Sequence, residues 1–286
     1  MTVELAPIGD GDVAATAAFL HANLNERVPA DVWERMVVAP WPGDAPNRGF
    51  LLRDEGRIVG VHLAFYADRV IAGKAVRVCN LAAWCVLPSH RLHSLKLLKA
   101  LLAQSGVDLF TDFSPSGSVV PLNRRLGFQE LDTTTFLVPG LPWPSVPGRI
   151  TVVSDPTAVE RLLDPRELPV YRDHRRATAA HHLVLRQGDR HCWVAFRRDR
   201  RKGLPLFASV LHVGDPEVFQ AGLTVFSRHL LVRRGIPAVL VEERLAGRLG
   251  IPAIRLRQAR PKMYRGPETG SEDVDYFYSE LTCVAW

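Results

Sequence analysis

The chain has 286 residues, of which 47% are hydrophobic and 23% are charged, and its formal net charge is +6. This composition is typical of globular proteins, and the length exceeds the roughly 100 to 200 residues of a usual domain, so we expect two domains. No apolar run reaches the roughly 18 to 20 residues of a membrane-spanning helix, and the N-terminus lacks the basic and apolar regions of a secretory signal, which predicts a cytoplasmic protein without a membrane span.

The first part of the chain predicts a strand, two helices and a hairpin. Its opening residues alternate between apolar and polar side chains, as those of an edge strand do. Asp10 or Asp12 can then cap a helix whose apolar residues recur on one face. After a second helix and a loop rich in Pro and Gly, Glu55-Gly56 has the chemistry of a hairpin turn. We therefore expect these elements, in order, over residues 3–8, 13–24, 30–38, 49–54 and 57–67.

The most informative stretch runs from Val76 to Leu102. Its first half, up to Leu87, is apolar enough to form a strand buried on both faces, and Pro88 ends that strand. A short polar turn follows, and Leu95, Leu98, Leu101 and Leu102 then recur at the spacing of an amphipathic helix. A buried strand, a tight turn and a helix N-terminus expose unpaired backbone N–H groups beside positive side chains, and such an arrangement can hold a phosphate.

A second strand and helix follow at once. Residues 108–113 (DLFTDF) predict a strand, and residues 114–125 predict a short helix. The sequence Leu126-Gly127-Phe128 closes that helix and leads into a further strand. The elements up to this point therefore have the order β-α-α-β-β-β-α-β-α-β.

Both units resemble parts of the GNAT superfamily of acyl-CoA N-acyltransferases. A strand ending in V-x-P, followed by Arg and a helix, is similar to the family's pyrophosphate-binding motif Arg/Gln-x-x-Gly-x-Gly/Ala, whose first residue matches Arg91. Ser94 stands where that motif has its first Gly, and Lys96 stands where it has the second Gly or Ala. The strand, helix and LGF sequence is similar to the family's second motif. The order of elements over about residues 1–138 is also that of the family.

The resemblance implies an N-acyltransferase that takes an acyl group from acetyl-CoA or another acyl-CoA and gives it to the amine of a small molecule, such as an amino sugar or amino acid. It implies that the end of the buried strand presents backbone groups to the pantetheine and thioester, and that the turn holds the pyrophosphate. Ser114 and Asn123 are expected to orient water or sulfur. The expected cofactor-binding residues are Trp84, Cys85, Val86, Arg91, Leu92, His93, Ser94, Leu95, Lys96 and Ser114. The four cysteines have no metal-ligand spacing, which predicts reduced thiols and no metal.

Three residues are candidates for the catalytic chemistry. The family often has a general-base Glu on the buried strand, where this chain has alanines, so Asp112 at the end of the next strand is our first candidate; it could instead cap the following helix. Asn123 stands where the family usually has a general-acid Tyr. Glu280 lies in the alternating tail 273–286, which predicts a final strand, and is a second base candidate if its face lines an interdomain cleft rather than solvent.

The second half of the chain repeats the first in outline. After the Pro-rich segment 139–148, a hairpin, the buried run 204–213, a long helix and the strand 238–242 follow in the same order as before. We expect an α/β (α+β) fold of two tandem GNAT-like domains, each a mixed, mostly antiparallel sheet flanked by helices. The predicted divisions are residues 1–138, the linker 139–148, and a degenerate copy at 149–286. The second copy places Glu217 where a phosphate would bind, so the cofactor is expected in the first copy.

The basic charge gathers in residues 172–176 and 197–202. It could attract acyl-CoA, an acidic acyl carrier protein, a nucleotide sugar or nucleic acid, but no aromatic residues interleave with these clusters, which does not favour nucleic acid. The run 197–202 lies between two strands and is typical of a solvated hairpin tip. Two alternative functions stay open: an aminoacyl-tRNA-dependent transferase of the peptidoglycan-bridge type, which also pairs two GNAT-like domains, and a non-catalytic module that binds acyl-CoA.

Overall fold

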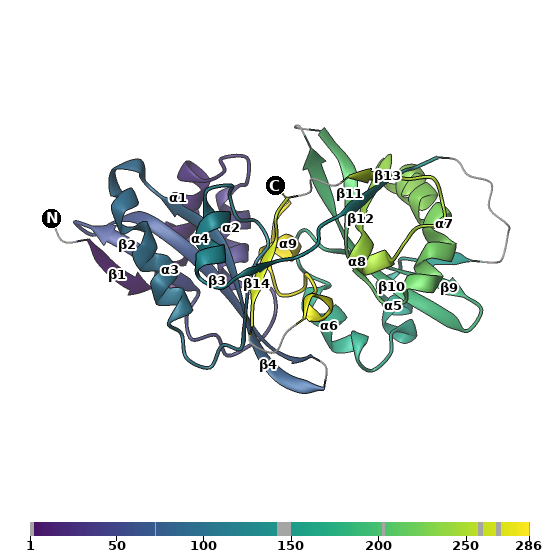
Figure 1. Cartoon of the computed structure of the whole chain (residues 1–286), viewed down its shortest axis with the longest axis horizontal. Coiled ribbons are helices and arrows are strands. Elements are labelled where there is room, and N and C mark those ends of the chain that lie inside the picture. The colour runs from purple at the N-terminus through teal and green to yellow at the C-terminus, as the bar shows by residue number, and fades with distance from the viewer. Residues whose placement is uncertain are drawn as a thin grey trace. The chain divides into compact units, whose positions relative to one another are not determined.

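The computed structural model describes residues 3–71, 73–141, 150–201, 204–256, 260–266 and 270–285. The chain divides into two compact units, each of which contains one seven-stranded sheet (Figure 1). The first unit comprises Met1–Leu131, Pro261–Val274 and Tyr278–Val284, and the second comprises Asp132–Arg260, Asp275–Phe277 and Ala285–Trp286. Among the described residues, no helix is both long enough and apolar enough to cross a membrane.

The first sheet is antiparallel except for one parallel pair, β4 with β5. Its strands, in spatial order, are β1 (Glu4–Pro7), β2 (Gly49–Asp54), β3 (Arg57–Ile71), β4 (Lys74–Val86), β5 (Leu109–Asp112), β14 (Met263–Arg265) and β6 (Gln129–Glu130). The predicted hairpin of β2 and β3 forms, with Glu55 and Gly56 at its turn, both at positive φ. The predicted buried strand is β4, and its apolar side chains fill both sides of the sheet.

Helices cover both faces of this sheet (Figure 1). The helical elements of the first unit are η1 (Asp10–Asp12), α1 (Val13–Asn23), α2 (Ala30–Val38), η2 (Pro88–His93), α3 (Ser94–Leu102), α4 (Val119–Arg125), η3 (Ser271–Asp273) and α9 (Glu280–Cys283). Helix α3 buries Leu97, Leu98 and Leu101, and the last two pack against β4 and β5. The apolar stripe predicted for this helix began at Leu95, but that side chain is 44% exposed. The core therefore uses a face of α3 that is rotated from the predicted one.

The second sheet repeats this plan, with β11 and β12 as its parallel pair. Its strands, in spatial order, are β13 (Ile254–Leu256), β7 (Thr135–Pro139), β12 (Ala238–Glu242), β11 (Leu204–Val213), β10 (Arg190–Arg201), β9 (His181–Gln187) and β8 (Thr151–Val153). Its helices are α5 (Pro156–Leu162), α6 (Glu167–His174), α7 (Pro216–Arg234) and α8 (Glu243–Ala246). Helix α7 packs Phe219, Leu223 and Phe226 into the core of this unit.

The two units share a sequence of elements and an irregularity. Each unit contains three consecutive antiparallel strands, then a helix, then a strand that pairs in parallel with the third. These elements are β2-β3-β4-α3-β5 in the first unit and β9-β10-β11-α7-β12 in the second. The register between β3 and β4 shifts near Leu63, and the register between β10 and β11 shifts near Phe196. A bulge at the same place in both copies agrees with the predicted tandem arrangement, because bulges are local features that persist in related sheets.

Two strands lie outside the predicted divisions of the chain. Strand β7 falls in the expected first domain up to residue 138, but it pairs with β12 and β13 in the second sheet. Strand β14 falls in the expected second domain, but it lies between β5 and β6 in the first sheet. Both strands have five residues or fewer, and so short a run does not specify which sheet it joins. Residues 142–148, which make up most of the expected linker 139–148, lie outside the described residues.

The tail is not the strand that its alternation predicted. Residues 276–279 form a bend, Tyr278 has a positive φ of 55°, and a short helix α9 begins at Glu280. The Ser279 hydroxyl accepts a hydrogen bond from the Leu281 amide and caps that helix. The alternation was misleading because aromatic side chains at 276, 277 and 278 are all buried, so this segment has no solvent face.

The run 197–202 is likewise not wholly a solvated tip. Residues up to Arg201 belong to strand β10, and residues 202–203 lie outside the described part of the chain. Arg197 and Asp199 are buried, with Nη2 of the arginine 3.6 Å from Oδ1 of the aspartate. The Ser209 hydroxyl donates to Oδ2 of Asp199 at 2.9 Å. This part of the basic cluster is therefore a structural ion pair.

Candidate active site

The end of strand β4 is the most irregular part of the first sheet. Strands β4 and β5 pair from Val78–Leu109 up to Leu81–Asp112, after which β5 ends and β4 continues to Val86. On the other side of β4, Ala82 pairs with Leu63 and Cys85 with Val61, so β4 has one residue more than β3. Within that bulge Ala83 has φ of 50°, a left-handed conformation that costs a non-glycine residue about 1 kcal/mol. The pairing of β4 with β3 is therefore irregular here, and its pairing with β5 does not continue beyond Leu81.

Asp112, the last residue of β5, lies at this opening. Its side chain is only 8% exposed, and it accepts hydrogen bonds from Nδ2 of Asn123 at 2.8 Å and from the Ser114 amide at 3.3 Å. Burial raises the pKa of the Asp112 carboxyl to about 6, and the two hydrogen bonds lower it only in part. A carboxyl group with a pKa near neutrality can take up and release a proton at physiological pH.

Ser114 connects this aspartate to the C-terminal segment. While its amide contacts Asp112, its hydroxyl donates to Oε1 of Glu280 at 2.8 Å. The Glu280 amide in turn donates to Oδ1 of Asn80 at 3.3 Å, and Nδ2 of Asn80 donates to the Thr111 hydroxyl at 2.9 Å. Four residues predicted to belong to the site thus form one hydrogen-bonded network, in which Ser114 is exposed and the other three are buried, although Glu280 is 166 positions from Ser114.

Two members of this network were not predicted. Asn80 and Thr111 are buried on neighbouring positions of β4 and β5. The available signal was the isolated asparagine in the apolar run VCNLAAW, because a polar side chain in a buried strand needs a hydrogen-bonding partner.

The three residues expected to contact the thioester lie beside the bulge. The Trp84 ring stacks on His62 of β3, with ring centroids 4.8 Å apart and an angle of 4° between the planes. His62 is buried, and desolvation lowers its pKa to about 3, so the imidazole is neutral. Burial also raises the pKa of the Cys85 thiol, which makes it a poor nucleophile. Val86 pairs with Gly60 at the end of the strand.

The expected phosphate-binding turn is helical. Residues 88–93 form the 3-10 helix η2, which leads directly into α3. The amides of His90 and Ser94 donate to the carbonyls of Leu87 and Arg91, so they are already used within the turn. Pro88 favours this conformation because its φ is fixed at a helical value, and the glycines of the family motif are absent.

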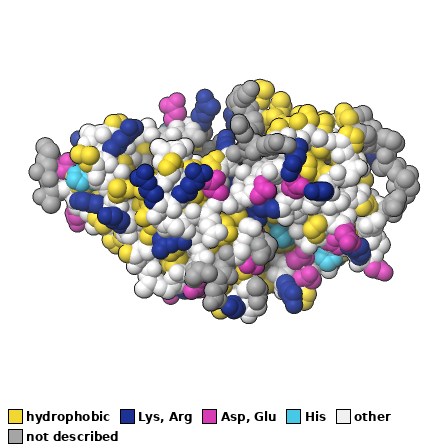
Figure 2. All heavy atoms as spheres, in the orientation of Figure 1, with side chains coloured by type: hydrophobic (Ala, Val, Ile, Leu, Met, Phe, Trp, Pro, Cys, Tyr) yellow, Lys and Arg dark blue, Asp and Glu magenta, His cyan; other side chains and the backbone are white. Residues whose placement is uncertain are grey.

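Most side chains of this turn point into solvent. Leu92 is 96% exposed, and Arg91 and Lys96 are exposed as well, whereas His93 and Ser94 are partly buried. The neighbouring His90 is anchored, because its Nε2 lies 3.0 Å from Oδ2 of Asp54 on β2. Figure 2 shows Lys and Arg side chains, in dark blue, over the α3 side of the first unit. The turn is therefore a fixed, positively charged surface.

A cavity of about 170 Å³ lies elsewhere in the first unit. It is lined by the end of α2, the following loop and β3, including Trp41, Asn47, Arg48 and Phe65. The Trp41 indole donates to the Tyr66 carbonyl at 3.1 Å. None of the predicted site residues lines this cavity.

In the second unit the residue that corresponds to Asp112 is bound in hydrogen bonds and an ion pair. Glu242 ends β12 as Asp112 ends β5, but it accepts hydrogen bonds from the Tyr276 hydroxyl and, at 3.0 Å, from Nε of Arg244. At the start of α7, Oδ1 of Asp215 accepts from the amides of Glu217 and Val218. The amides that could bind a phosphate are thus capped by a carboxylate, as the acidic start of this helix led us to expect.

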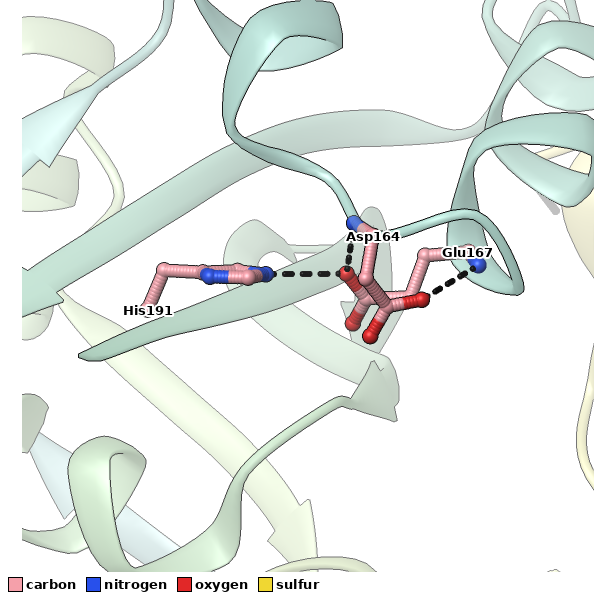
Figure 3. Close-up of side chains that lie close together, drawn as sticks. All are labelled: Asp164, Glu167 and His191. Carbon is pink, nitrogen blue, oxygen red and sulfur yellow. Dashed lines mark hydrogen bonds and ion pairs between the residues drawn. The ribbon is translucent and has the colours of Figure 1, made fainter. Parts of the chain in front are cut away.

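A surface group in the second unit has side chains that metal ions use. One ligand atom each from Asp164, Glu167 and His191 lies within 4.8 Å of the others (Figure 3). The Asp164 amide donates to Glu167 and the Glu167 amide donates to Asp164, at 3.3 and 3.1 Å, which is the reciprocal cap of helix α6. His191 adds a contact of 3.1 Å to Oε2 of Glu167. These hydrogen bonds account for the group.

Solved structures reveal the same architecture. A GCN5-related N-acetyltransferase from Anabaena variabilis matches with a TM-score of 0.62 and 12% sequence identity, over 92% of this chain and 72% of that one. One from Kribbella flavida matches with a TM-score of 0.60 and 14% identity, over 93% and 72%. A candidate acetyltransferase from Pyrococcus horikoshii matches with a TM-score of 0.57 and 13% identity, over 96% and 93%. The chain has the tandem GNAT fold.

This GNAT-like chain is matched by no protein-family model, and no curated protein sequence matches it either. The likeness at 12 to 14% identity concerns the fold, and the predicted GNAT fold class is confirmed. The roles of the individual site residues stay predictions, which depend on the geometry described above.

Proposed function

We propose that this chain is an N-acyltransferase that moves an acyl group from a phosphopantetheine thioester, such as that of acetyl-CoA or another acyl-CoA, to the amine of a small molecule. The observation that carries this proposal is the position of Asp112. A buried carboxyl group with a pKa of about 6 lies at the end of β5, next to the part of β4 that continues past β5 and bulges. We continue to expect that the acceptor is an amino sugar or an amino acid.

The proposed reaction needs one proton transfer at the amine and one at the sulfur. The amine nitrogen attacks the thioester carbonyl carbon, a C–N bond forms, the C–S bond breaks, and the sulfur leaves as a thiolate, which then takes up the proton that Asp112 has accepted from the amine. Asp112 accepts the proton that the amine loses, because its carboxyl is largely ionised above pH 6. Main-chain N–H groups at the bulge near Ala83 stabilise the negative charge that develops on the carbonyl oxygen.

The neighbouring residues hold this base in place. Asn123 fixes one carboxylate oxygen of Asp112 through its hydrogen bond of 2.8 Å. Ser114 fixes the other through its amide and is itself held by Glu280. In this proposal Asp112 is the general base, and Asn123, Ser114 and Glu280 are positioning residues.

The test is acyl transfer by the full chain with acetyl-CoA or octanoyl-CoA and a panel of amino sugars and amino acids, followed by thiol release and by mass spectrometry of the amide. Asp112→Asn should lower the rate by about 10² to 10⁴, the usual contribution of a general base. Asp31→Asn, on the exposed face of α2, is the matched control. Full activity of Asp112→Asn would remove this residue from the mechanism. Binding of acyl-CoA without an amide product from any amine would favour the non-catalytic module instead.

A further inference from the structure

We propose that the acyl donor is carried on the phosphopantetheine arm of a small acidic carrier protein, which docks on η2 and the exposed side of α3. This inference rests on the proposed function, because it specifies the donor of the same reaction. The docking surface comprises the exposed side chains of Arg91, Leu92, Leu95, Lys96 and Lys99.

The first argument is the apolar part of this surface. Leu92 is 96% exposed and Leu95 is 44% exposed, and they lie three positions apart where η2 meets α3. The core does not need them, since Leu97, Leu98 and Leu101 supply the buried face of the helix. Single exposed leucines are common, but a pair on adjoining turns provides an apolar centre that a protein partner can cover.

The second argument is charge. The chain has no Asp or Glu between residues 69 and 107. Arg91, Lys96 and Lys99 flank the two leucines, and none of the three forms an ion pair with another described residue. Because their positive charges are not neutralised by ion pairs, they attract an acidic surface and speed its encounter with this face. An apolar centre with a basic rim is complementary to a partner whose docking helix is apolar and acidic.

The third argument is the conformation of the turn. A diphosphate is usually bound by several free amides of a glycine-rich turn, but η2 uses its amides internally and has no glycine. The arm of a carrier protein ends in a single phosphodiester, which needs fewer donors. Arg91 and Lys96 can supply charge to that phosphodiester through their side chains, and contacts with the carrier protein supply the remaining affinity.

A phosphopantetheine arm bound at η2 would also lie close in the chain to the end of β4. Only Leu87 separates Val86, the last residue of β4, from the start of η2. An arm anchored on η2 can therefore follow the end of β4 towards the bulge and Asp112. The anchored pair of His90 and Asp54, with 3.0 Å between Nε2 and Oδ2, keeps the turn in place at the end of β2.

Calorimetry with the full chain tests this inference. The probes are an octanoyl-loaded bacterial acyl carrier protein, the same protein without its phosphopantetheine arm, octanoyl-CoA, and vesicles of anionic phospholipid. We expect micromolar binding of the loaded carrier protein that weakens about tenfold or more in Leu92→Glu and in Lys96→Glu. Binding should also weaken as salt rises, because exposed charges are screened. Val70→Glu, at a 74% exposed position on β3, is the control and should leave binding unchanged.

The contrary results distinguish failure of the docking inference from failure of the proposed function. If octanoyl-CoA binds more tightly than the loaded carrier protein and Leu92→Glu affects neither, the docking inference is overturned while the acyltransferase proposal stands. Uptake by vesicles without binding of the carrier protein would also overturn it, in favour of a membrane surface. If no thioester is bound or consumed, the proposed function itself fails. Since Leu92 is exposed, thermal denaturation should show that Leu92→Glu folds as the wild type does.

Discussion

Replacing Asp112 by Asn should stabilise the protein at neutral pH while it lowers the rate of acyl transfer. The pKa of this buried carboxyl group is about 6, compared with an ordinary value of 3.8, and this difference corresponds to about 3 kcal/mol of unfavourable free energy for the ionised form in the folded chain. The asparagine carries no charge, so it avoids that penalty. Oδ1 of Asn123 is buried and has no hydrogen-bond partner among the described residues, and a rotated Asn123 amide could accept a hydrogen bond from the new side chain.

The sign of the effect depends on pH. Above pH 6 the wild-type carboxylate is ionised in both states and the folded state bears the desolvation penalty, so the variant should be more stable by up to about 3 kcal/mol. Between pH 6 and pH 4 the folded wild type takes up a proton and the advantage of the variant declines. Below about pH 4 the carboxyl is protonated in the folded and the unfolded chain, and the advantage should vanish.

Urea denaturation of both proteins at pH 8 and at pH 4, followed by tryptophan fluorescence, measures this difference. Asp31→Asn serves as the control, because removal of an exposed carboxylate that pairs with Arg35 should change the free energy of unfolding by less than about 1 kcal/mol. Equal stability of Asp112→Asn and wild type at both pH values would refute the reasoning, since it would mean that the folded structure does not penalise the charge of Asp112.

Four further substitutions test the packing and capping of the two units. Leu98→Ala should lower the free energy of unfolding by about 2 to 5 kcal/mol, because this side chain is buried between α3 and the sheet, whereas the half-exposed Leu95→Ala should cost less than about 1 kcal/mol in the same denaturation assay. Gly49→Ala should destabilise by at least about 2 kcal/mol, since φ is +108° and the added Cβ would lie 2.2 Å from the His62 carbonyl oxygen; unchanged thermal stability would contradict this. Asp215→Ala removes the cap of α7 and should cost about 1 kcal/mol, and a loss in helical circular dichroism would accompany it.

The central elements of each unit could be predicted because their signals are strong and local. A long apolar run that ends in Pro or Gly-Asp-Pro, followed by leucines at helical spacing, specifies a buried strand and its helix in both halves. The closeness of Asp112 and Asn123 could also be expected, because one ends a strand and the other lies on the helix that follows. These contacts depend on neighbours in the sequence.

The remaining features depend on distant contacts. Nothing in the tripeptide of β14 indicates that it pairs with β5 rather than with a strand of the second sheet. The tail predicted a strand, but Tyr278 at positive φ and the Ser279 cap create a helix start that brings the Glu280 side chain to Ser114. The sequence motif suggested a turn with free amides, but Pro88 favours the helical conformation of η2, in which amides are hydrogen-bonded within the turn.

The position of β14 has a consequence for biosynthesis. The first sheet is completed by a strand that lies between β5 and β6 but leaves the ribosome only after almost the whole second unit has been made. Until then β5 has no strand on this side, and the core of the first unit lacks Met263. An unpaired strand edge of this kind readily pairs with another chain. A fragment that stops at the apparent end of the first half should therefore aggregate or require a chaperone, and the N-terminal copy should mature only as part of the complete translation product.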